Sequence, residues 1–90
     1  MFSIGDRVVI VDTKSICFSA YVEVGMTATI RNIISESIGI EFDVNVGGHD
    51  LGGMCKYGYG WYVLPKNIIL AESINEELPS VSLDIKGLFA

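Results

Sequence analysis

The side chains in this sequence that could carry out acid–base or nucleophilic chemistry are one histidine, its neighbouring aspartate and two cysteines. His49 and Asp50 are adjacent, Cys55 follows six residues later, and Cys17 lies far away in the chain. A general base needs a nucleophile within hydrogen-bond reach, and Cys55 is the nearer candidate. Both residues lie in segment 43–60, where six of 18 residues are glycine. Such a loop holds catalytic geometry poorly without a rigid scaffold, so we expect no enzyme activity. We expect His49 and Asp50 to hydrogen-bond the loop's own backbone or, as the alternative, to contact a ligand.

The same residue types argue against a cofactor. Two cysteines and one histidine fall short of the four ligands of a structural zinc site. The glycine pairs Gly47-Gly48 and Gly52-Gly53 are not followed by the Gly-Lys-Ser/Thr of a phosphate-binding loop. Acidic residues at 36, 41, 43 and 50 do not have the spacing of an EF-hand and are expected to form a solvated face. We expect no metal, no cofactor and two reduced thiols.

Charge and hydropathy narrow the choice of partner. The chain of 90 residues has a net charge of −5, and its six basic residues are scattered singly. A phosphate backbone is bound mainly through clustered Lys and Arg, so we expect no direct contact with nucleic acid. No stretch approaches the roughly 20 apolar residues of a membrane span, and the first residues lack the pattern of a signal peptide. We therefore expect a cytoplasmic protein whose partner is another protein, with a basic, nucleic-acid-binding host protein as the favoured kind.

The elements that must position these residues are predicted to be strands. Runs of β-branched and alternating apolar residues, bounded by glycine and polar turns, are typical of short strands. A loop is expected over 12–24, a tight turn over 65–67, and no helix before residue 72. The predicted fold class is all-β: a small five-stranded barrel with a long glycine-rich loop at 43–60 and a C-terminal tail. The expected strands cover 6–12, 27–34, 38–42, 61–64 and 68–70.

The composition changes after residue 71, so we predict two units, a barrel over 1–71 and an acidic tail over 72–90. The tail carries four acidic residues and one lysine. Residues 81–85 alternate apolar and polar side chains like an edge strand. The tail either folds against its own barrel or pairs with another sheet, including that of a second copy.

The order of these motifs resembles that of SH3-like barrels. The motifs are Gly5-Asp6-Arg7-Val8, residues 24–30, and Ile38-Gly39-Ile40-Glu41-Phe42-Asp43. Downstream, Gly48-His49-Asp50 followed by Gly58-Tyr59-Gly60-Trp61 is similar to the ending of small phage and bacterial proteins with mind-bomb-type SH3 repeats. The glycine-rich loop is also distantly similar to that of CAP-Gly domains, although it lacks their Lys-Asn pair. The resemblance covers residues 4–71 and implies a binding role.

Together these features predict a non-enzymatic protein-binding module. We expect a small phage or bacterial accessory protein that docks on a larger host protein, such as a nucleic-acid-handling defence complex, with inhibition of that protein as one use of the docking. The alternative is a structural subunit that forms a homodimer through its tail. Tyrosine and tryptophan supply the stiff contact area of binding hot spots, although Trp61 and Tyr62 could instead fill the barrel. The predicted partner-binding residues are Tyr21, His49, Asp50, Leu51, Tyr57, Tyr59 and Trp61.

Overall fold

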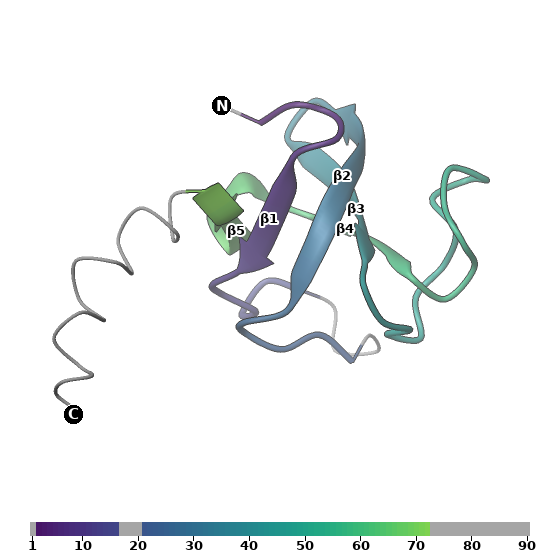
Figure 1. Cartoon of the computed structure of the whole chain (residues 1–90), viewed down its shortest axis with the longest axis horizontal. Coiled ribbons are helices and arrows are strands. Elements are labelled where there is room, and N and C mark those ends of the chain that lie inside the picture. The colour runs from purple at the N-terminus through teal and green to yellow at the C-terminus, as the bar shows by residue number, and fades with distance from the viewer. Residues whose placement is uncertain (1, 17–20, 73–90) are drawn as a thin grey trace, which may run out of the picture.

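The computed structural model describes residues 2–16 and 21–72. Cys17 and the tail beyond Glu72, about which the sequence makes predictions, lie outside these residues. The described part contains five strands and one short 3-10 helix (Figure 1). The predicted all-β class is confirmed. The elements are β1 (Arg7–Ile10), β2 (Thr27–Ile34), β3 (Ser37–Phe42), β4 (Gly60–Val63), η1 (Pro65–Asn67) and β5 (Ile68–Leu70).

The strands form where β-branched residues alternate with polar ones. In β1 the exposed Arg7 is followed by buried Val8, half-buried Val9 and buried Ile10. In β3 the predicted apolar face is confirmed, because Ile38, Ile40 and Phe42 are only 3%, 0% and 2% exposed. This period of two is the burial pattern of a sheet that packs on one face.

All five strands pair antiparallel in one sheet, in the order β4-β3-β2-β1-β5. The predicted closure into a barrel is not found, because β4 and β5 are the two edges of the sheet. A barrel needs an unbroken ladder between its first and last strands. Here β5 has three residues, which pair with β1. Among residues 2–16 and 21–72, the far side of β4 pairs only with His49 of its own preceding loop.

The hydrophobic core lies on one face of the sheet. Its residues are at most 3% exposed, and Phe42 is the largest of the fully buried side chains. One core residue, Val46, comes from the loop between β3 and β4, so this loop belongs partly to the core. The core residues are Val8, Ile10, Ala28, Ile30, Ile38, Ile40, Phe42, Val46, Val63 and Ile68.

Candidate binding surface

The glycine-rich loop is fastened to the start of β4 by backbone hydrogen bonds. The N–H groups of Val46 and Gly48 both donate to the carbonyl of Gly58, at 2.9 and 3.1 Å. His49 and Gly60 exchange a reciprocal pair of bonds at 2.9 and 2.8 Å. In Figure 1 the loop extends beyond the sheet on the side away from β5. Four backbone hydrogen bonds, two of them in an isolated β-bridge, therefore join the two arms of the loop next to the edge strand β4.

His49 and Asp50 hydrogen-bond the loop itself, which confirms the first of the two predictions made for them. The His49 Nδ1 atom accepts the N–H of Leu51 at 3.1 Å, so in the neutral ring the hydrogen is assigned to Nε2. The Asp50 carboxylate accepts the N–H of Gly52 at 3.0 Å. The Asp50 carbonyl accepts the N–H groups of residues 53, 54 and 55. Side-chain and backbone acceptors of residues 49 and 50 therefore hold this turn.

Leu51, predicted to touch a partner, is instead an anchor of the loop. It is 2% exposed, and its side chain reaches the backbone of Gly39 in β3 and Gly60 in β4. A Cβ atom placed on Gly60 would lie 2.8 Å from Leu51 Cγ and 2.7 Å from Cys55 Sγ. Leu51 has a positive φ of 55°, which is unfavourable for a side chain of this type, and burial of its apolar side chain offsets that cost. A buried side chain provides no contact area, so Leu51 is excluded from the candidate surface.

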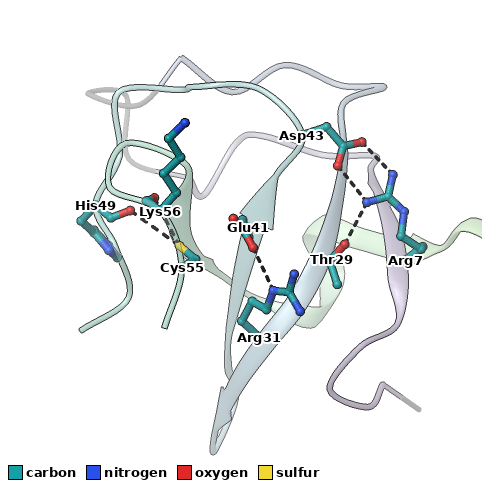
Figure 2. Close-up of polar contacts among 8 residues, drawn as sticks. All are labelled: Arg7, Thr29, Arg31, Glu41, Asp43, His49, Cys55 and Lys56. Carbon is teal, nitrogen blue, oxygen red and sulfur yellow. Dashed lines mark hydrogen bonds and ion pairs between the residues drawn. The ribbon is translucent and has the colours of Figure 1, made fainter. Parts of the chain in front are cut away.

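Cys55 is not paired with the imidazole of His49. Its Sγ atom lies 3.9 Å from the His49 carbonyl oxygen and 3.5 Å from that of Lys56 (Figure 2). Burial, followed by the nearby carboxylates of Glu41 and Asp50, raises the pKa of this thiol. A reactive cysteine needs a lowered pKa, so the environment of Cys55 opposes nucleophilic chemistry.

The predicted aromatic residues differ in exposure. Tyr21 and Tyr57 are 76% and 74% exposed, whereas Tyr59 and Trp61 are half-buried. The ring of Trp61 packs against the core and lies 5.1 Å from that of His49. The amine of Lys56 sits 5.1 Å from the centre of the Tyr59 ring, a cation–π distance.

Tyr21 and Tyr57 are carried by neighbouring segments. The Tyr21 N–H donates to the Val46 carbonyl at 2.8 Å, and the Val46 N–H donates to Gly58, the residue after Tyr57. The Tyr21 ring lies close over Gly47, where a Cβ atom would come within 3.2 Å of it. We call these two residues the tyrosine surface. The loop before β2 and the loop before β4 thus meet at one place.

The polar face of the sheet contains a charge network that the sequence analysis missed. Arg7 binds both carboxylate oxygens of Asp43, at 2.7 and 2.8 Å, and also donates to Thr29 (Figure 2). Thr27 donates a short hydrogen bond to Asp43. Arg31 Nε donates to Glu41 at 2.9 Å. The sequence signal for this network is the set of polar residues at alternate strand positions. Arg7 and Asp43 are 36 residues apart in the sequence, however, and only the strand register shows that they pair. The acidic residues predicted to be a solvated face are here partly neutralised.

Asp43 should make stability depend on pH. Its contacts with Arg7, above all the hydrogen bonds, lower its pKa to about 2 from 3.8. The folded state therefore favours the ionised Asp43 carboxylate. Its contribution to the free energy of unfolding is complete above the unfolded pKa and is lost as the pH falls from about 4 to about 2. Because both side chains are nearly half exposed, we expect it to be about 1 kcal/mol or less.

The measurement is the urea midpoint of the wild type and of Asp43→Asn at pH 7, 4 and 2. The difference in urea midpoint between the wild type and Asp43→Asn should become smaller as the pH is lowered. The control is Glu36→Gln, at a turn residue that forms no ion pair within the described residues. A difference in urea midpoint that stays constant with pH would show that the ion pair between Arg7 and Asp43 does not stabilise the fold.

Comparison with known proteins gave no match: no protein-family model, curated protein or solved structure is similar to this chain. Within residues 2–16 and 21–72, no helix has the length and apolar character needed to cross a membrane.

Proposed function

We propose that this chain is a non-enzymatic protein-binding module whose partner contacts the tyrosine surface. The observation that carries the proposal is the exposure of Tyr21 and Tyr57, 76% and 74%, on segments that are themselves hydrogen-bonded in place. Large side chains on a preordered backbone lose little conformational freedom on binding, which favours affinity. Tyrosine also combines an apolar ring with a polar tip, as binding hot spots do.

The chemistry of the loop supports a binding role rather than catalysis. His49 Nδ1 and the Asp50 carboxylate are engaged by loop N–H groups, and the surroundings of Cys55 raise its pKa. These contacts hold the glycine-rich loop, which also carries Tyr57.

The partner is proposed to be a protein with a basic face. Residues 1–72 contain eight acidic and five basic residues, a net charge of −3, and the remaining 18 residues bring the total to −5. Opposite charge speeds encounter and favours the correct orientation of the two proteins. Small size and acidic balance fit a phage or bacterial accessory protein that inhibits a larger nucleic-acid-handling host protein.

We further infer a relationship to the SH3-like class. The strand order β4-β3-β2-β1-β5, with the one-turn helix η1 between β4 and β5, supports it, as do the motifs in residues 4–71. In this chain the sheet is open at β4 and β5.

The proposal predicts that removing both tyrosine rings abolishes partner capture while leaving the fold intact. A Tyr21→Ser/Tyr57→Ser double variant removes two exposed rings, and each ring at a hot spot contributes about 2 kcal/mol, or roughly 30-fold in Kd. The measurement is affinity capture from host lysate, followed by calorimetric titration of the captured protein.

The matched control is Ile34→Ser, which removes an apolar side chain that is 55% exposed at the end of β2. We expect it to bind as the wild type does. Equal affinity of the double variant and the wild type for the captured protein would refute the tyrosine surface as the site.

A further inference from the structure

The side chain of His49 lies where the glycine-rich loop meets the edge strand of the sheet. Its backbone exchanges two hydrogen bonds with Gly60 in β4, and its Nδ1 atom accepts the N–H of Leu51 at 3.1 Å. The centre of its ring lies 5.1 Å from that of Trp61 and 5.8 Å from that of Tyr62. The half-buried imidazole therefore joins a residue of the loop to two aromatic residues of β4.

The hydrogen bond between His49 and Leu51 requires a neutral imidazole. A neutral ring has one donor nitrogen and one acceptor nitrogen, whereas both nitrogens of an imidazolium are donors. Protonation of His49 would place two N–H groups against each other across 3.1 Å. Turning the ring over gives no relief, because neither edge of an imidazolium accepts a hydrogen bond. Since histidine is the side chain that ordinarily changes charge between about pH 5 and 8, this bond is a pH-sensitive contact.

Leu51 is the residue that this bond holds in place. Its positive φ of 55° is unfavourable, and its side chain is packed against the backbone of Gly39 and Gly60. Within residues 2–16 and 21–72, His49 Nδ1 is the only acceptor for the Leu51 N–H. Protonation of His49 therefore removes a restraint from the residue that anchors the loop.

The other titratable groups around the ring are engaged elsewhere. In the described part of the chain none of them forms a hydrogen bond or an ion pair with the imidazole. Nearby carboxylates and aromatic rings favour a positive charge on the ring through space, but the contact at Nδ1 is a direct one that protonation makes repulsive. These groups and their partners are the Asp50 carboxylate with Gly52, the Glu41 carboxylate with Arg31, the Tyr62 hydroxyl with Asn32, the Cys55 thiol with the carbonyls of His49 and Lys56, and the Lys56 amine with the Tyr59 ring.

We propose that His49 is a pH-sensitive switch for the glycine-rich loop. The neutral side chain holds Leu51 and keeps the loop closed against β4, and the protonated side chain releases Leu51, so that the loop opens more often. Replacing one hydrogen bond by two facing donors should raise the opening equilibrium constant about tenfold.

The switch regulates the proposed binding surface, because Tyr57 is carried by the same loop. This regulatory meaning, though not the switch itself, rests on the proposed function. A partner that needs the closed loop should bind more weakly when His49 is protonated. The loss of affinity is at most the same tenfold, because the open population alone sets it.

The test is NMR of the full chain at pH 8 and pH 4.5 in the absence of any partner. The chemical shifts of the His49 ring nitrogens should show hydrogen on Nε2 alone at pH 8. The protection factors of the His49, Leu51 and Gly60 amides, each relative to an unfolded chain at the same pH, should fall about tenfold at pH 4.5. The amides of Ile30 and Ile40 should then stay more protected than these three, because the loop opens without unfolding of the sheet.

Two variants at the same position separate the switch from other effects of pH. The side-chain oxygen of His49→Asn can accept the Leu51 N–H and does not titrate, so its loop protection should be equal at the two pH values. His49→Leu has no acceptor and should show the lowered protection already at pH 8. Asp43 keeps its charge at pH 4.5, since its pKa is about 2.

Three results would overturn the proposal. They are hydrogen on Nδ1 of the neutral His49 ring, equal loop protection of the wild type at the two pH values, and an equal fall in His49→Asn. Because the experiment contains no partner, such a failure is distinct from failure of the tyrosine surface in the capture experiment.

Discussion

Gly60→Ala is expected to lower the free energy of unfolding by about 3 kcal/mol. The new Cβ atom would lie 2.7 Å from Cys55 Sγ and 2.8 Å from both Leu51 Cγ and the His49 carbonyl oxygen. One of these three is a backbone atom in the reciprocal pair of hydrogen bonds that joins the loop to β4, so the strain cannot be relieved by one rotamer change. The measurement is urea unfolding followed by tryptophan fluorescence.

The matched control is Gly53→Ala in the same loop. No atom lies within 4 Å of a Cβ there, and only its positive φ of 100° opposes the substitution, at a cost of about 1–2 kcal/mol. Adding Cys55→Ala to Gly60→Ala removes one of the three close contacts and should restore part of the lost stability. If Gly60→Ala cost no more than Gly53→Ala, the loop would not be packed against the sheet as described.

Asn67→Ala should destabilise the protein by a similar amount, about 3 kcal/mol, because it removes three part-buried hydrogen bonds and the buried Asn67 side chain at once. Asn67 is 1% exposed and ends η1. Its Oδ1 accepts the N–H of Leu64 at 2.7 Å, and its Nδ2 donates to the Asp12 carbonyl at 2.9 Å and to Ser15 Oγ at 3.0 Å. This one side chain therefore joins the turn before β5 to the loop that follows β1.

Thermal unfolding monitored by circular dichroism would measure the loss of stability in Asn67→Ala. Lys66→Ala changes the exposed neighbour within the same turn and is expected to lower the melting temperature little. Similar melting temperatures for the two variants would mean that the hydrogen bonds of Asn67 do not stabilise the turn.

The strands could be predicted from the sequence because a sheet that buries one face has apolar residues at every second position of its strands. The predicted strands 27–34 and 68–70 agree with β2 and β5. The predicted fourth strand, 61–64, lies one residue later than β4, because hydrogen bonds that the apolar pattern does not contain set the ends of this strand. His49 pairs with Gly60 at one end, and Asn67 takes the N–H of Leu64 at the other.

Closure of the sheet could not be predicted in the same way. The pattern of apolar residues shows how many strands bury a face, but not whether the first and last strands of the sheet meet. Here β5 is only three residues long, and the edge of β4 is met by the loop.

The candidate site was predictable in part. A loop rich in glycine and aromatic residues is visible in composition, and the roles of His49 and Asp50 follow from their tendency to bond nearby N–H groups. The burial of Leu51 was not visible, because it depends on two glycines, Gly39 and Gly60, that leave space on strands distant in sequence. The pairing of Arg7 with Asp43 likewise depends on strand register.

The proposed binding surface requires that the glycine-rich loop is held as rigidly as the sheet beside it. Amide hydrogen exchange, followed by NMR on the full chain, tests this most directly, because exchange rates report how often each hydrogen bond opens. We predict that the N–H groups of Val46, His49 and Gly60 exchange nearly as slowly as those in the middle of β2 and β3. Exchange of these three amides at the rate of an unfolded chain, while the sheet stays protected, would contradict the account.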